Sequence, residues 1–151
     1  MTEAEAPGAR RSIGRTIARV LLGASLVLAG IGHLTVARQE FQAQVPDFVP
    51  LDPDLVVLAS GVVEIVLGLA LLVLRRWWVW VGLIAAAFFI AVFPGNISQW
   101  LNARAGFGLD TDAARFGRLF FQPVLVAVAL WSTGAWDALR HWWRARSRRS
   151  S

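Results

Sequence analysis

The sequence predicts an all-α fold, a bundle of four transmembrane helices with the N- and C-termini both cytoplasmic. The chain has 151 residues, the length of one domain, and 56% of them are hydrophobic. The apolar residues form four long continuous runs, unlike the alternating strands of a membrane β-barrel. Arginines gather at the ends of these runs. A soluble domain of this size would leave too much apolar surface in water, so we expect a membrane protein.

The first helix is expected at residues 13–35, after a disordered cytoplasmic tail at residues 1–12. Arg15 and Arg19 fall in its first turns, where long side chains can extend to the membrane surface. Arginines followed by a short apolar stretch also fit a signal peptide. Because no good small-x-small cleavage site follows, and more apolar runs come later, we expect a retained anchor instead.

The second helix is expected at residues 54–75 and has the clearest signals. The segment from Leu55 to Leu74 holds one charged residue, Glu64. At 1.5 Å per residue such a segment spans roughly 30 Å, the thickness of the hydrocarbon layer. Asp52 is suited to cap this helix, and Pro53 to occupy its first position.

The third and fourth helices are expected at residues 77–94 and 112–134. We expect Pro94 and Gly95 to end the third helix, with a short amphipathic stretch beyond them. Pro123 should kink the fourth. The membrane domain therefore covers residues 13–136, and residues 137–151 form a basic, Trp-containing tail on the cytoplasmic interface.

Arginine placement predicts the orientation of the bundle. Eleven arginines flank one side of the four expected spans and four flank the other. Cytoplasmic loops carry the excess of basic residues, so both termini are expected inside, and the protein in the plasma (inner) membrane. The net charge of +5 could suggest nucleic acid, but the arginines do not line one helical face. We expect anionic lipid headgroups as the partner and no nucleic acid.

Glu64 is the first candidate site residue, because it lies close to the middle of the second span. An ionised group there costs roughly 2.5–3.5 kcal/mol on insertion scales. It is either a structural carboxyl that joins two helices or a group that handles protons or binds a ligand; we favour the second interpretation. Gly61 and Gly68 share its face and would let another helix or a ligand approach closely.

Five further polar residues are expected in the outer half of the bundle. Each has an ordinary alternative: His33 could be a solvated interfacial histidine, Arg118 a residue extending to the surface, and Asn96 and Gln99 plain loop or capping groups. Arg118 could instead pair with Glu64 or bind an anionic or quinone-like oxygen. The candidate ligand-binding residues are His33, Glu64, Asn96, Gln99, Arg118 and Gln122.

The segment at residues 44–50 is unusually apolar for an exterior connection. It could fold back as a lid over the mouth of the bundle, or anchor in the membrane interface. No metal site and no haem are expected, because the chain has no Cys and its two histidines, His33 and His141, belong to opposite membrane faces.

Several short motifs, taken together, resemble the DoxX-like family of small four-helix membrane proteins. They are Gly30-Ile31-Gly32-His33, Val45-Pro46-Asp47-Phe48-Val49-Pro50, Ser60-Gly61-Val62-Val63-Glu64-Ile65 and Phe93-Pro94-Gly95-Asn96-Ile97. The resemblance covers roughly residues 13–135. It implies a four-helix membrane fold, a link to thiosulfate:quinone oxidoreduction or to membrane complexes that handle oxidative stress, and His33, Glu64 and Asn96 as the family-like polar positions. The absence of Cys argues against a thiol mechanism.

The leading functional hypothesis is a quinone- or small-molecule-binding subunit of a membrane redox complex, with a quinone as the cofactor to test. Whether the chain is itself an enzyme stays open. The alternative is a non-catalytic assembly or interaction factor, with a membrane-complex or homo-oligomeric partner. A third hypothesis, a small proton-coupled transporter that uses Glu64, fits less well because four helices are few and no inverted repeat is visible.

Overall fold

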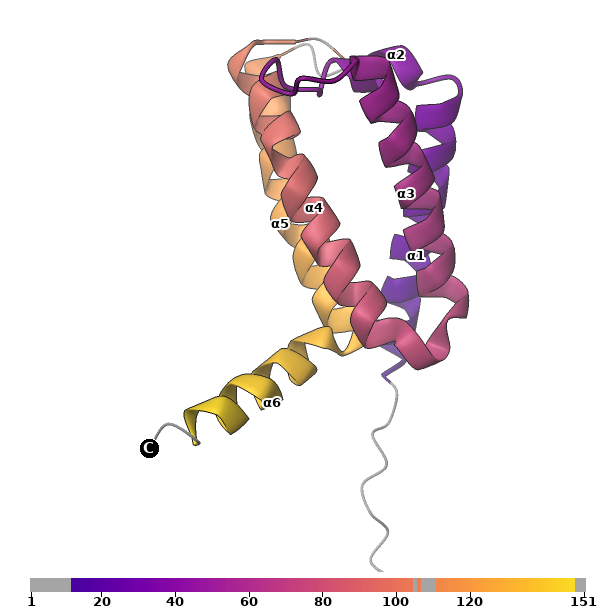
Figure 1. The fold of residues 1–151 in the computed structure, drawn as a ribbon, viewed down its shortest axis with the longest axis vertical. Coiled ribbons are helices and arrows are strands. Elements are labelled where there is room, and N and C mark those ends of the chain that lie inside the picture. Colours follow the sequence, from indigo (N-terminus) through magenta and orange to yellow (C-terminus); the bar gives the residue numbers. More distant parts are fainter. Residues whose placement is uncertain (1–11, 105, 107–110, 149–151) are drawn as a thin grey trace, which may run out of the picture.

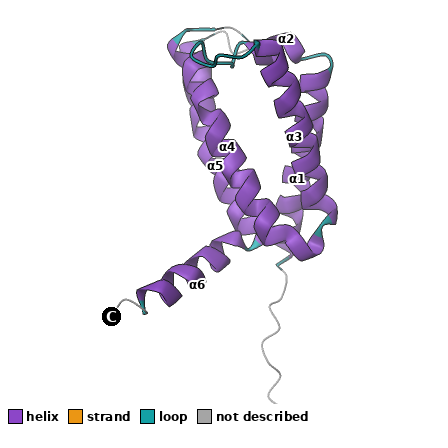
Figure 2. Cartoon of the chain, viewed as in Figure 1, coloured by secondary structure: helices purple, strands orange, loops and turns teal. Residues whose placement is uncertain are grey.

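The computed structural model describes residues 12–104, 106 and 111–148, and within them the chain is helical, with no strand (Figures 1 and 2). Four of the helices are long and apolar enough to cross a membrane. The elements in chain order are α1 (Ile13–Leu34), α2 (Arg38–Gln42), α3 (Pro53–Val73), the short 3-10 helix η1 (Arg75–Trp77), α4 (Trp78–Leu101), α5 (Asp112–Thr133) and α6 (Ala135–Ser147). Apart from Ser12, the tail expected at residues 1–12 lies outside the described residues.

Helix ends follow local side-chain chemistry. The carboxylate of Asp52 accepts hydrogen bonds from the backbone N–H groups of Asp54 and Leu55, at 2.8 and 3.4 Å, and so caps α3 as expected. The hydroxyl of Thr111 accepts from Ala114 N–H at 3.2 Å and caps α5. Gly134 ends α5 with a φ of 79°, a left-handed conformation that glycine adopts without strain.

The expected end of the third helix at Pro94 is wrong, because α4 continues through this proline to Leu101. Pro94 has no N–H, so the carbonyl of Ile90 loses its helical donor. Such prolines are tolerated in membrane helices whose neighbours supply polar groups. Here Gln122 of α5 donates to the carbonyl of Phe89, one residue before Ile90, at 2.6 Å. Packing between helices therefore outweighs the local tendency of proline to end a helix.

The pair of helices α1 and α3 packs through opposed glycines. A Cβ built on Gly68 would lie 2.6 Å from the carbonyl oxygen of Gly23, and one on Gly30 would lie 2.5 Å from that of Gly61. The two glycines are seven residues apart on each helix, as an antiparallel register requires. This bears out the expectation that Gly61 and Gly68 admit a second helix, since only residues without Cβ allow backbones so close.

The second pair, α4 and α5, leans against the first at one end only. We call the end of the bundle near η1 and α6 the lower half, and the end that carries α2 the upper half (Figure 1). One cluster of buried apolar side chains joins all four long helices, and its members lie in the lower half and at the middle of the bundle: Leu22, Leu26, Leu67, Leu71, Val81, Ala85, Ala86, Phe89 and Ala129. In the upper half the two pairs stand apart (Figure 1).

Helix α6 leaves the bundle directly after Gly134 and extends away from it at the lower end (Figure 1). Its tryptophans Trp136, Trp142 and Trp143 are exposed. Arg140 and Arg146 lie over Trp136 and Trp142, at 5.4 and 5.2 Å from the ring centres. Stacked Arg and Trp side chains of this kind suit the boundary between lipid and water.

Candidate functional site

A cavity of about 1100 Å³ lies between the two helix pairs, and in the upper half polar side chains join its apolar lining. A cavity lined mostly by apolar groups with a few polar ones is the usual form of a small-molecule site. The polar side chains in the lining are Ser25, His33, Gln44, Ser60, Glu64, Asn96, Arg118 and Gln122. Five of the six candidate residues are therefore brought together.

His33 and Glu64 form a buried pair across α1 and α3. The Nδ1 atom of His33 lies 2.9 Å from Oε2 of Glu64, and the two side chains are 9% and 13% exposed. The same Nδ1 also lies 2.9 Å from the carbonyl oxygen of Ala29. Oε2 lies at contact distance from the ring. Among the described residues, however, no donor group points at it with hydrogen-bond geometry. One ring N–H cannot serve both acceptors fully, so this carboxyl oxygen can accept from a donor on a ligand.

The ring of His33 is fixed from two further sides. Phe41 of α2 stacks on it, with ring centres 3.4 Å apart and planes 16° from parallel. A Cβ on Gly61 would lie 2.7 Å from Cβ of His33, so the glycine leaves space for the histidine against α3. The interpretation of His33 as a solvated interfacial residue is wrong, because it is only 7% exposed.

Asn96 and Gln122 form a second polar group on the opposite wall. The amide of Asn96 donates to the Gln122 side-chain oxygen at 3.1 Å, and the Gln122 amide donates to the Phe89 carbonyl at 2.6 Å. The interpretation of Asn96 as a loop or capping residue is wrong, since it lies inside α4 and is buried. This chain of bonds holds both amides at the cavity wall.

Arg118 reaches the cavity from α5 and bonds to the connection between α2 and α3. With the Gln44 amide turned so that its oxygen faces the guanidinium, that oxygen accepts from both terminal nitrogens of Arg118, at 2.8 and 3.2 Å. Arg118 is therefore held against Gln44, whereas the ion pair of Glu64 within the described residues is with His33. The expected alternative of an ion pair between Arg118 and Glu64 is therefore not found among the described residues.

These features together describe a membrane cavity with apolar walls and a polar upper end. One family model covers most of the residues that form it. The model of the family described as Domain of unknown function (DUF8561) matches residues 22–133. The chain belongs to this family. No curated protein and no solved structure matches it. The DUF8561 match includes every candidate site residue and both glycine pairs, and ends before α6. The resemblance to the DoxX-like family stays a prediction.

Gln99 is the candidate residue that lies outside the lining of the cavity. It is 1% exposed, and its side-chain amide donates to the carbonyl oxygen of Arg104 at 3.4 Å. It was expected in the site because the predicted topology placed it in the outer half with the other polar residues, but α4 turns it toward the chain beyond Leu101. Gln99 therefore supports the end of α4 rather than the cavity.

Residues 44–50 cover the upper end of the cavity, as the lid alternative expected. Gln44, Val45, Pro46, Phe48 and Val49 line it, and Val45 is buried. Arg104 donates to the carbonyl oxygen of Val45 at 3.0 Å and pairs with Asp47. A Cβ on Gly95 would lie 2.5 Å from the Gln44 carbonyl oxygen. The lid is thus attached to α4 and to the residues that follow it.

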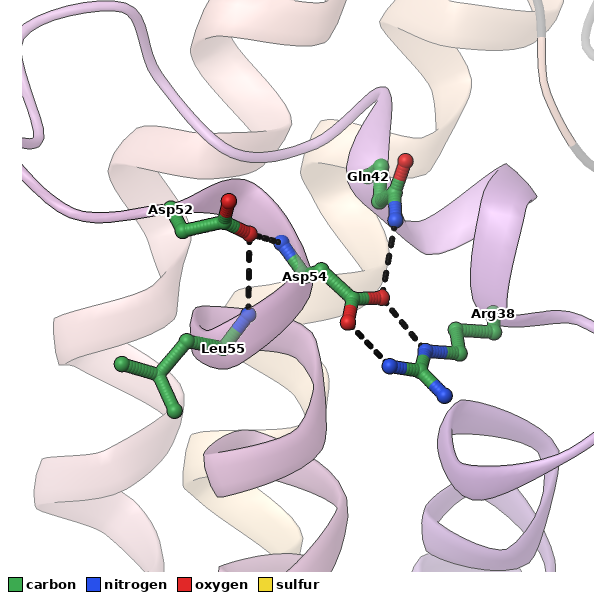
Figure 3. Close-up of polar contacts among 5 residues, drawn as sticks. All are labelled: Arg38, Gln42, Asp52, Asp54 and Leu55. Atoms are coloured by element: carbon green, nitrogen blue, oxygen red, sulfur yellow. Dashed lines mark hydrogen bonds and ion pairs between the residues drawn. The ribbon is translucent and has the colours of Figure 1, made fainter.

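A polar cluster fixes α2, the first part of this cover, to the start of α3 (Figure 3). Arg38 forms a two-armed ion pair with Asp54, and Gln42 donates to the same carboxylate at 3.0 Å. The hydrogen bond to Asp54 raises the pKa of Arg38 above its ordinary value. The sequence places Gln44 in the possible lid, but it does not predict the contacts of Phe41 with His33 or of Gln44 with Arg118, because these depend on the docking of α2.

Proposed function

We propose that the protein binds a small lipid-soluble molecule of the quinone class in the cavity, as a DoxX-like multi-pass protein of the cytoplasmic membrane. The observation that carries the proposal is the convergence of His33, Glu64, Asn96, Arg118 and Gln122 on one large apolar-walled cavity. A quinone headgroup is flat and apolar and has carbonyl oxygens at opposite ends. It needs hydrogen-bond donors at its edges and apolar side chains against its faces.

The two polar groups of the cavity suit that chemistry. Arg118 and the amides of Asn96 and Gln122 carry N–H donors for a carbonyl oxygen on one wall. On the other wall, Oε2 of Glu64 accepts and lies against the His33 ring. A hydroxyl of the reduced quinol can donate to it. The site therefore has hydrogen-bond partners for both the oxidised and the reduced headgroup. A subunit of a redox complex must bind both forms.

Direct binding of ubiquinone and menaquinone to purified protein tests the proposal. We expect the quinone retained per protein after gel filtration to fall at least about tenfold in Glu64→Gln and in Arg118→Gln. Glu40→Gln is the matched control, because Glu40 is an exposed carboxyl outside the lining. Equal and negligible binding by the wild type and all variants would exclude a quinone site.

We further propose that both termini face the cytoplasm, on the support of the arginine distribution. The chain contains no Cys, so single cysteines can be introduced without background. Ser147→Cys reports on the end of α6, and Val36→Cys on the opposite end, where Val36 is 95% exposed. In intact cells a membrane-impermeant maleimide should label Val36→Cys and not Ser147→Cys. The reverse pattern would invert the topology.

A second candidate, a non-catalytic interaction subunit, is favoured by α6 alone. This helix presents exposed Trp and Arg side chains outside the bundle. Aromatic residues and Arg are enriched in the energetically important parts of protein interfaces. Removal of residues 135–151 should then release a stoichiometric partner that co-purifies with the full chain from native membrane, whereas a chain that purifies alone would count against this role.

A further inference from the structure

On the side of α3 and α4 the cavity is closed below by packed side chains. Leu22, Leu26, Leu67 and Leu71 of the first helix pair meet Phe89 and its neighbours of the second in one packed cluster. Leu71 is fully buried. A ligand cannot pass through side chains packed at the density of a protein interior without unfolding them. Entry from below through this cluster is therefore blocked.

The cavity is also covered above by residues 44–50. Arg104 bonds to Val45 within this segment, Arg118 bonds to Gln44, and Gly95 lies directly under the Gln44 carbonyl. These contacts join the segment to two different helices and to the residues after α4. An entry route from water on the upper side would need all of them to break together.

The lining extends unequally along the helices. On α1 it runs from Ala18 to His33, and on α5 from Ala114 to Val128. On α3 it covers only Val56 to Glu64, and on α4 Phe89 to Asn96. At 1.5 Å per residue these lengths are roughly 22 Å on α1 and roughly 12 Å on α3. The cavity therefore continues downward as a groove between α1 and α5.

This groove is open to the outside of the bundle. Its lining residues Leu21, Phe121 and Val124 are 62%, 62% and 53% exposed. Gly117 also lines it, and a Cβ built there meets no atom within 4 Å. Exposed apolar side chains at membrane depth face lipid. The seam between α1 and α5 thus joins the polar upper cavity to the hydrocarbon layer.

We infer that the ligand is a lipid-borne molecule with a long apolar tail, which enters sideways between α1 and α5. Its head lies in the upper cavity beside Glu64 and Arg118, and its tail lies in the groove past Leu21 and Val124. This inference rests on the proposed function and adds to it the class of ligand and its route. The polar groups above and the mostly apolar groove below match the two ends of such a molecule.

Blocking the seam tests the route. Val124→Trp places a large ring in the groove from α5, and Leu21→Trp does so from α1. Ala91→Trp blocks the opposite seam, because Ala91 is an exposed lining residue of α4. Ala59→Trp is the matched control on the outer face of α3, outside the lining. Each variant is reconstituted in vesicles that contain ubiquinone with a long isoprenoid tail, extracted, and assayed for retained quinone.

We expect retention of the long-tailed quinone to fall at least about tenfold in Val124→Trp and Leu21→Trp, to fall less in Ala91→Trp, and to stay within about twofold of wild type in Ala59→Trp. A tail-free ubiquinone, equilibrated with the same proteins, should bind Val124→Trp, Leu21→Trp and Ala59→Trp alike, because these positions lie away from the polar head groups. Loss of the long-tailed probe in Ala91→Trp alone would place the route between α3 and α4 and overturn the inference. Equal retention in all variants would also overturn it, while the proposed function would stand. If the wild type retained neither probe, the proposed function itself would fail.

Discussion

The two halves of the bundle belong to the same four long helices and are packed in opposite ways. In the lower half, Leu71, Ala85 and Ala129 are fully buried in a cluster that joins all four long helices. In the upper half, the same helices separate around a cavity of about 1100 Å³ that holds the buried polar groups. The lower half therefore stabilises the fold, and the upper half leaves space for a ligand. Such a division is typical of proteins in which the functional site lowers the stability of the fold and close packing elsewhere compensates for the loss.

Gly68→Leu should have the largest effect on stability, because Gly68 lies where two helix backbones approach most closely in the lower half. A Cβ there would lie 2.6 Å from the Gly23 carbonyl oxygen, so α1 and α3 must separate, at a cost of about 3 kcal/mol or more. We expect loss of most of the monodisperse protein in detergent gel filtration. Gly117→Leu, in open space of the upper half, is the control and should elute as wild type. Equal behaviour of the two variants would mean that the halves are not packed differently.

Leu71→Ala should be the next most disruptive change. Leu71 is 0% exposed in the lower cluster, and the void left by its side chain costs about 2–5 kcal/mol. Thermal unfolding in detergent should show a clearly lower midpoint. Phe121→Ala removes a larger side chain from the open groove, where it is 62% exposed, and should change the midpoint little. A larger loss from Phe121→Ala would contradict the comparison.

Unlike the two variants above, the double variant His33→Leu with Glu64→Leu should not lower the stability of the fold. Replacement of a buried ionisable pair by apolar residues of similar size is often neutral or stabilising, by about 1 kcal/mol or more. We expect an unchanged or raised unfolding midpoint together with loss of quinone retention. A lowered midpoint would show that the pair holds α1 and α3 together, as the structural interpretation of Glu64 held.

Arg38→Gln should have the smallest effect on stability. Its ion pair with Asp54 is partly exposed, and exposed pairs contribute little. The folded state raises the pKa of Arg38, so its contribution persists until the pH rises through that raised pKa and stays constant across the neutral range. The midpoint should shift less than in Leu71→Ala at every pH from mildly acidic to mildly basic. A pronounced pH dependence in this range would point to another group.

The sequence alone predicted most of the ends of the individual helices. The starts of α3 and α5 follow from Asp52 and Thr111, whose side chains cap them. It failed at Pro94, because the continuation of α4 depends on what α5 offers: Gln122 bonds to the Phe89 carbonyl beside the proline. Gln99, beyond the proline in α4, bonds to the Arg104 carbonyl instead of lining the cavity. Local chemistry predicts where a helix can begin, but a neighbour decides whether it passes through a proline.

Residue type and helical period were enough to predict that four apolar helices form, that an acid lies in the middle of one span, and that glycines share its face. The packed bundle was needed to show that Glu64 meets His33 rather than Arg118, that Phe41 and Gln44 belong to the site, and that the groove runs along α1 and α5. The physical reason is that periodicity assigns each side chain to a face of its own helix. The rotation and offset between helices come from close packing, here the opposed glycines of α1 and α3.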